Sequence, residues 1–537
     1  LAGFIGREAW KSADMANLGF MAEVAQGSAQ WWQPTLLGAA PEFPALLPFW
    51  LGAWAIQLTP AGWPTDYFAR IPFGLLAGLA MAATWYATYY LARSPRAQPV
   101  AFAFGGEARP ADYARAIADG GLMAYIACLG LAQLSHETTP ALAQLGCTAL
   151  LFFGLAVLPY RRTAAAGATA LGLLGLALSG APMLALLYGL GGAAVHWLDR
   201  APDAAGTATP RRCAVEALLI LAAATAVSAV AAWADLWRWK IALPHATWAA
   251  WNGIAQLLLW FTWPTWPLVL WSAWRWRRQL FSRQISRHLA LPAWFVGVTV
   301  VATLLTGATD RTLLLALPPM ATLAAFALPT LQRQVSALID WFTLLFFSTC
   351  GFIIWVIWSA MQTGFPAQPA ANVARLAPDF VAHFSVLEFS LAVLATLAWA
   401  WLVKWRVGRH RAALWKSLVL PSAGAALCVL LLTTLWLPLL NHAQSYTTLV
   451  QRTMMHIGKA DCVEVTALSQ GQIAAFQFYG RLPLRRAGTV PQCQWLLAEP
   501  GPDMAIPDAV DISQWTLYAS ALHRVEGGES VLILRRK

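Results

Sequence analysis

The sequence has little charge. Asp, Glu, Lys and Arg make up only 11% of the 537 residues, against roughly 25% in ordinary soluble proteins. Hydrophobic residues make up 59% of the chain, and the mean hydropathy is +0.55. Because so few groups can bind water, the composition excludes a soluble globular protein and indicates a protein embedded in lipid.

Two further absences narrow the function. The chain has no glycine-rich loop of the Rossmann or P-loop type, so it shows no sign of nucleotide binding. A transporter or channel is expected to carry charged residues within its spans and an internal repeat. The apolar runs of this chain contain few central charges, and no internal repeat is visible. A transporter or channel is therefore the least favoured class.

The apolar runs are long enough to cross a hydrocarbon core roughly 30 Å thick as helices. About twelve are present, many of them ending in one of the 30 tryptophans, which suit the headgroup zone. This predicts an all-α polytopic membrane domain. The runs lie near residues 70–92, 119–134, 140–159, 163–179, 181–197, 213–234, 251–273, 289–307, 311–329, 336–360, 385–403 and 417–440.

The net charge of +11 comes from short clusters between these runs. One set of alternate loops holds 20 Lys and Arg residues and the other holds 4, so the first set is predicted to be cytoplasmic. Residues 1–69 and 441–537 then both lie on the outer side of a bacterial inner membrane. Because an outer start without a signal peptide is unusual, we expect one more span to precede Leu1.

These patterns divide the chain into three regions. Residues 1–69 form a first outer loop with juxtamembrane amphipathic helices, 70–440 form the transmembrane domain, and 441–537 form a small α+β domain. In the last region, strand-like segments alternate with turns. They are Cys462–Leu468, Ile473–Phe478, Gln494–Leu497 and Val531–Leu534.

Two of the seven cysteines, Cys462 and Cys493, fall in this outer domain. An oxidising compartment favours a disulfide between them, and two buried free thiols are the alternative.

An ordered series of short motifs runs from the first region into the start of the first apolar run. They are Trp10-Lys11-Ser12-Ala13-Asp14, Gln30-Trp31-Trp32-Gln33-Pro34-Thr35-Leu36-Leu37-Gly38, Pro41-Glu42-Phe43-Pro44 and Ala69-Arg70-Ile71-Pro72. Ser135-His136-Glu137-Thr138-Thr139, Leu317-Pro318-Pro319 and Asp340-Trp341-Phe342 follow. In this order the chain resembles the GT-C lipid-phosphate-sugar glycosyltransferases, especially the aminoarabinose transferase (ArnT) group. The resemblance covers nearly the whole chain, although no single motif is intact.

The resemblance implies transfer of a sugar from a polyprenyl-phosphate carrier to a lipid or envelope-glycan hydroxyl at the periplasmic face. Such a reaction needs a carboxylate near the acceptor and cations near the leaving phosphate. Asp14 matches the acidic motif of the family, and its alternative role is that of a helix N-cap. Glu137, with the adjacent His136, is a second catalytic candidate because an expected acid is missing from this motif.

The residues expected to bind phosphate and a metal also differ from those of the resembled family. Phe43 stands where the family has a phosphate-binding Lys, so Lys11, Arg311 and Arg70 are the candidate substrate-binding cations. Arg311 could instead anchor the interface. The resemblance also implies a possible divalent metal, for which Glu42 and His245 are the available ligands.

Two functions remain open at this point. In one, the chain is a glycosyltransferase with a rebuilt site. In the other, it is a catalytically inactive GT-C homologue that acts as a subunit or scaffold of a membrane complex, possibly with other membrane proteins as partners.

Overall fold

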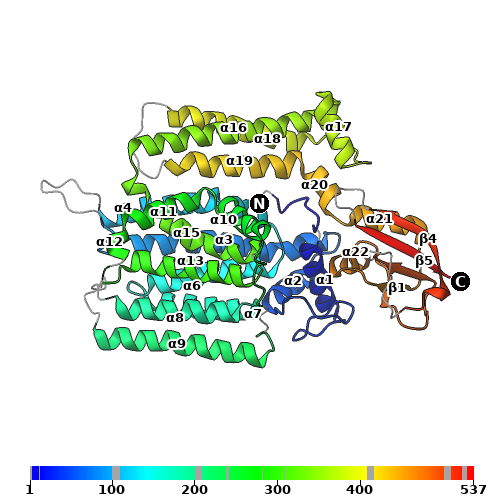
Figure 1. Ribbon diagram of the computed structural model, residues 1–537, viewed down its shortest axis with the longest axis horizontal. Helices are drawn as coiled ribbons and strands as arrows, with labels where there is room; N and C mark the ends of the chain where they lie inside the picture. Colours follow the sequence, from blue (N-terminus) through cyan, green and yellow to red (C-terminus); the bar gives the residue numbers. More distant parts are fainter. Residues whose placement is uncertain are drawn as a thin grey trace.

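The structure is a computed structural model of the chain. It describes residues 3–10, 12–98, 109–199, 209–237, 241–280, 282, 284–307, 309–407, 417–500, 510–522 and 529–537. Most of these residues lie in helices that run side by side along the long axis of the molecule, and a small sheet lies at one end (Figure 1).

The helices begin and end as follows. Before and within the first half of the bundle they are α1 (Ala13–Gln26), α2 (Leu47–Gln57), α3 (Thr65–Ala92), α4 (Pro110–Ala127), α5 (Leu129–Leu134), α6 (Pro140–Val157), α7 (Arg162–Leu178), α8 (Pro182–Leu198) and α9 (Pro210–Trp233). Then come α10 (Trp248–Phe261), α11 (Thr265–Arg275), α12 (Arg277–Leu280), α13 (Arg287–Leu305), α14 (Asp310–Leu313), α15 (Leu317–Ala325), α16 (Arg333–Thr363), α17 (Ala367–Leu376), α18 (Val386–Val407), α19 (Val419–Leu435), α20 (Leu437–Gln444), α21 (Thr447–Ile457) and α22 (Gln470–Phe478).

Each predicted span coincides with a helix or with a broken helix. Within the described ranges, seven helices are long and apolar enough to cross a membrane, or eight if the bent pair α19–α20 is one span. Helices α7 and α8 are apolar but slightly shorter, and two other spans are interrupted. The polytopic helical fold is confirmed, and the total of twelve spans stays a prediction.

The two interrupted spans break at the same place in the bundle. The break between α4 and α5 lies beside the break between α10 and α11, because the amide of Leu129 donates to the carbonyl of Trp263 at 3.0 Å. Nearby, the Thr265 hydroxyl lies 2.7 Å from the sulfur of Cys128 and donates to the carbonyl of Ala124. Each break thus supplies hydrogen-bond partners for backbone groups of the other. Backbone groups freed at a helix break inside lipid need such partners.

The helices form a main bundle and an additional layer. The segment from Leu313 to Leu328 is buried throughout and lies at the centre of the main bundle. Helices α16, α18 and α19 lie together above it in Figure 1 and have a hydrophobic core of their own around Phe347 and Trp399. The main core is continuous and reaches from the bundle into the C-terminal domain.

The C-terminal domain contains a mixed five-stranded sheet in the order β2-β1-β3-β5-β4. Its strands are β1 (Val463–Thr466), β2 (Leu484–Arg486), β3 (Trp495–Ala498), β4 (Trp515–Leu522) and β5 (Ser530–Arg536). Strand β1 is parallel to β2 and β3, and β5 is antiparallel to β3 and β4. A disulfide joins Cys462 to Cys493, with their Cα atoms 5.3 Å apart, at the starts of neighbouring strands.

One predicted strand is wrong. The segment Ile473–Phe478 belongs to helix α22, which begins with a capping box: the Ser469 hydroxyl accepts from the Gln472 amide, and the Gln472 side chain accepts from the Ser469 amide. Helix α22 packs closely on α1, where a Cβ at Gly19 would lie only 2.5 Å from that of Ala474. A short apolar run can form either a strand or a buried helix. The capping box and the packing on α1 explain why this run forms a helix.

The described residues before α3, which we call the first segment, lie at the same end of the bundle as the C-terminal domain. Helices α1 and α2 lie between the bundle and the sheet (Figure 1). This agrees with the sequence prediction that 1–69 and 441–537 share one side. The junction is polar as well as apolar, since Asn441 accepts from the Trp10 indole at 3.0 Å and donates to the carbonyl of Gly6.

Candidate functional site at one end of the bundle

Asp14 lies in the first turn of α1, one residue inside the helix. The N-cap is Ser12, whose side chain makes no capping hydrogen bond. The alternative role of Asp14 as an N-cap is therefore wrong. Its carboxylate instead turns toward the bundle and is 2% exposed, and its place near a helix N-terminus suits a negative charge.

All four acceptor positions of the Asp14 carboxylate are used. Oδ1 accepts from the amide of Thr138 at 2.7 Å and from its hydroxyl. Oδ2 accepts from the amide of Trp10 at 3.2 Å and pairs with Nη2 of Arg7 at 3.1 Å. Since a carboxylate offers about four lone-pair positions, Asp14 is saturated by the chain itself.

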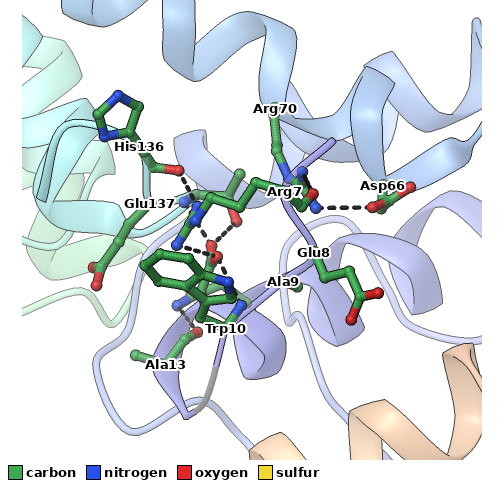
Figure 2. A network of polar contacts seen from close by, with 12 residues as sticks. Arg7, Glu8, Ala9, Trp10, Ala13, Asp66, Arg70, His136 and Glu137 are labelled. Carbon is green, nitrogen blue, oxygen red and sulfur yellow. Dashed lines mark hydrogen bonds and ion pairs between the residues drawn. The ribbon is translucent and has the colours of Figure 1, made fainter. Parts of the chain in front are cut away.

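Arg7 connects the first segment to the bundle (Figure 2). Its guanidinium pairs with Asp14, donates to the carbonyl of His136 and lies 4.2 Å from the centre of the Trp10 ring. Arg70, near the start of α3, donates to the carbonyl of Arg7 and forms an ion pair with Asp66 at 2.8 Å. Both arginines are nearly fully buried, so their contacts fix the path of residues 7–10.

The loop after α5 carries the second carboxylate. Glu137 lies between His136, held by Arg7, and Thr138, held by Asp14. Its carboxylate forms a two-pronged ion pair with Arg311 of α14, with both nitrogen-to-oxygen distances 3.1 Å. The Arg311 side chain is 41% exposed and that of Glu137 is 16% exposed, so this pair is the solvent-facing part of the site.

The pKa values of the two carboxylates are shifted in opposite directions. Burial by itself would raise the pKa of Asp14, but the charges of Arg7 and Arg70 and the hydrogen bonds from Thr138 outweigh it and hold the pKa below its usual value. Burial dominates at Glu137 and raises its pKa, helped by the charge of Asp14 and opposed by Arg311 and Arg7. Asp14 is thus held ionised, and the pKa of Glu137 lies above its ordinary value.

His136 is half-buried and lies against residues 3–4. Its ring lies 5.3 Å from that of Phe4 and 3.3 Å from the Ser135 hydroxyl, measured at Nδ1. A Cβ on Gly3, which has φ +87°, would lie 2.5 Å from the His136 ring. Residues 3–4 therefore cover one part of the ring.

The structure thus brings together five predicted site residues, Asp14, His136, Glu137, Arg70 and Arg311, although they come from four distant parts of the sequence. The sixth cationic or catalytic candidate, Lys11, lies outside the described residues.

The two predicted metal ligands are not part of this group. Glu42 and His245 are both exposed, on the segment before α2 and on the connection before α10. In the described part of the chain, no three or more His, Cys, Asp or Glu side chains are grouped so that they could hold a metal ion. Two ligands alone do not make a metal site, and a site at Glu42 and His245 stays a prediction.

Sequence reasoning missed Arg7, which organises the site. The one signal was its position: Arg7 and Glu8 interrupt an otherwise uncharged opening segment. Asp66 was also missed, although its spacing of four residues from Arg70 is that of a helical ion pair.

Chemically, the arrangement presents a half-exposed guanidinium fork and a carboxylate of raised pKa over a rigid, buried ion pair. A guanidinium fork fits phosphate as well as it fits carboxylate. A carboxylate with a raised pKa is suited to accept a proton during a reaction.

Comparisons with known proteins support the same fold. No family model and no curated protein sequence matches the chain. Among solved structures, it resembles ArnT from Cupriavidus metallidurans in the apo state, with a TM-score of 0.63 at 12% identity. It also resembles that protein bound to undecaprenyl phosphate, with a TM-score of 0.60 at 11% identity. Both matches cover 99% of this chain and 95% of the other. The chain therefore has the ArnT-like GT-C fold that the motif order predicted.

Proposed function

We propose that this chain transfers a sugar from a polyprenyl-phosphate donor to a hydroxyl of a lipid or envelope glycan at the periplasmic face of the inner membrane. The observation that carries the proposal is the Arg311–Glu137 pair, which faces solvent beside the buried Arg7–Asp14 pair in a fold shared with ArnT. The neighbour's complex with undecaprenyl phosphate supports a polyprenyl-phosphate partner.

In this proposal Arg311 receives the donor phosphate. The carboxylate of Glu137 now occupies both prongs of its guanidinium, which is the arrangement a phosphate would adopt. A bound phosphate competes for the fork and frees Glu137. Arg311 then stabilises the charge that develops on the departing polyprenyl phosphate.

Glu137 accepts the proton of the acceptor hydroxyl. As that oxygen bonds to the anomeric carbon, the bond from this carbon to the phosphate oxygen breaks, and the polyprenyl phosphate leaves with the electron pair. The proton held by Glu137 passes to solvent. Asp14 is saturated by its four donors, so we assign it to holding Thr138 and hence the loop that carries Glu137. Its predicted role as the proton acceptor stays a prediction.

A non-catalytic role is the second candidate, and the saturation of Asp14 is the observation that favours it. Phe43, which stands at the position of the family's phosphate-binding Lys, also favours the non-catalytic role. If this candidate holds, the buried ion pairs serve to join the first segment to the bundle, and the chain acts as a subunit or scaffold in a membrane complex.

Binding of undecaprenyl phosphate to the purified full chain separates the two candidates. We expect saturable binding in the wild type that weakens about tenfold or more in Arg311→Ala, because a charged hydrogen-bonding partner is lost. Arg452→Ala is the matched control, since Arg452 also pairs with an acid, Asp379, at 2.8 Å but lies in α21. Absence of saturable binding in the wild type would contradict the enzyme and favour the scaffold.

A further inference from the structure

A second charged surface lies at the opposite end of the bundle, at the corner where α11 meets α12. Figure 1 places α12 at the end away from the sheet. The chain from 273 to 288 contains five arginines and no acidic residue. Three of them, Arg275, Arg277 and Arg278, are exposed within four positions. We call these three residues the arginine corner.

Among the described residues, no carboxylate balances the arginine corner. Elsewhere in the described part of the chain, arginines predicted to face the same side are often paired with acids: Arg162 and Arg212 lie 3.0 and 3.5 Å from Glu216. No described carboxylate lies within ion-pair distance of Arg275, Arg277 or Arg278, and the protein partner seen for Arg277 is the carbonyl of Trp274, at 2.8 Å. Three neighbouring positive charges therefore face outward, and no carboxylate from the described ranges compensates them.

An apolar helix face leads directly to these charges. On α11, Leu270 is 60% exposed and Trp274, one turn later, is 68% exposed. The guanidinium carbon of Arg277 lies 4.3 Å from the centre of the Trp274 ring. An aromatic ring at the headgroup level with arginines beyond it is the arrangement found at membrane interfaces.

The corner is held in place by two tryptophans on its inner side. The indole of Trp276 donates to the carbonyl of Phe326 at 3.1 Å, and that of Trp271 donates to the Thr330 hydroxyl at 3.0 Å. The arginines are thus presented from an anchored turn. A preorganised cluster of this kind loses less entropy on binding than a flexible basic loop.

We propose that the arginine corner binds the phosphate of an anionic phospholipid headgroup, with the acyl chain lying along Leu270 and Trp274. The guanidinium groups match phosphate oxygens in geometry and charge. The continuous apolar face distinguishes a lipid from free phosphate, because inorganic phosphate has nothing to place on it. This site is independent of the sugar-transfer site and of the proposed function.

The test is native mass spectrometry of the delipidated full chain with phosphatidylglycerol and, separately, phosphatidylcholine. We expect saturable binding of phosphatidylglycerol in preference to phosphatidylcholine, weakening roughly fivefold for each arginine replaced by Gln. The triple variant R275Q/R277Q/R278Q should therefore lose nearly all of this preference, and the corresponding Arg→Lys variant should keep most of it. Added salt should weaken the binding.

The matched control is R109Q/R161Q/R211Q, which removes the same charge from three exposed arginines at the starts of α4, α7 and α9, predicted to face the same side. The control should bind as the wild type does, and all three triple variants should keep the thermal midpoint of the wild type. Equal retention of the two lipids by the wild type, or an equal loss in R275Q/R277Q/R278Q and in the control, would overturn the proposal. Displacement of phosphatidylglycerol by millimolar inorganic phosphate would also overturn it and indicate a free-phosphate site.

Discussion

Arg7 and Asp14 form an ion pair that is almost entirely withdrawn from water, with 3.1 Å between Nη2 and Oδ2 and side-chain exposures of 3% and 2%. The pair fixes the loop of Glu137 from both sides, through the carbonyl of His136 and through Thr138. It makes the geometry of the solvent-facing site depend on residues that never contact solvent.

Removing one member of this pair should strongly destabilise the protein. In Arg7→Met the carboxylate of Asp14 stays buried without its cation, at an expected loss of about 3–5 kcal/mol. The double variant Arg7→Met/Asp14→Leu should recover much of this loss, because it leaves no isolated charge. Thermal and denaturant unfolding in detergent measure both effects. A double variant less stable than Arg7→Met would refute this account, and Arg452→Met serves as the exposed-pair control.

Asp14 should also shape the acid stability. Its folded pKa is lowered from the ordinary value of 3.8, so its contribution is complete above the unfolded pKa and is lost as the pH falls through the lower folded value. Asp14→Asn should therefore be less stable than the wild type at neutral pH, and the difference should shrink as the pH falls below about 4. Melting curves from pH 7 to pH 3 measure this, and two parallel profiles would count against it.

Glu137→Gln should slow sugar transfer by roughly 10²–10⁴-fold, as expected for loss of a general base. The carboxylate form accepts the proton, so the wild-type rate should rise with pH through a midpoint above 4.5, the ordinary value from which the pKa of Glu137 is raised. This limb should be absent in Glu137→Gln. The measurement is the pH profile of transfer from a polyprenyl-phosphate-sugar donor; an unchanged profile would assign the proton to another group.

Glu137→Gln also tests binding separately from chemistry. The neutral amide competes less well for Arg311, so undecaprenyl phosphate should bind at least as tightly as in the wild type. A large loss of binding in this variant would mean that Glu137 contributes to the fold of the site and not to the reaction.

Loss of the Cys462–Cys493 disulfide should lower stability by about 2–4 kcal/mol, because the bond closes a loop between residues 31 positions apart. The double variant Cys462→Ser/Cys493→Ser should melt at a lower temperature than the wild type. A reducing agent should lower the melting midpoint of the wild type and leave that of the double variant unchanged. The buried Cys128 and Cys147 provide the control, since alkylation under native conditions should not reach them. Equal midpoints with and without reductant would contradict this prediction.

The polytopic helical domain could be predicted from the sequence because lipid requires long apolar runs with internally satisfied backbones. Such runs are local, so they are visible without a structure. The order of the motifs likewise indicated the fold that the structural comparison then showed. Asp14 was named as a site residue because it matches the acidic motif of the family that the sequence resembles. Glu137 and Arg311 were named because each lies at the outer end of an apolar run.

What joins these residues is not local. Asp14 and Thr138 are separated by 124 positions, and Arg311 and Glu137 by 174. Only the packing of α1, α5 and α14 at one end of the bundle shows that Asp14 is saturated and Glu137 is not. For the same reason a short apolar run before Phe478 was taken for a strand, since its partner helix α1 is far away in sequence. The sequence by itself determined which segments enter lipid, through the local cost of placing backbone and charge there. The tertiary structure decided which charges meet, since an ion pair depends on distances in space that spacing along the chain does not contain.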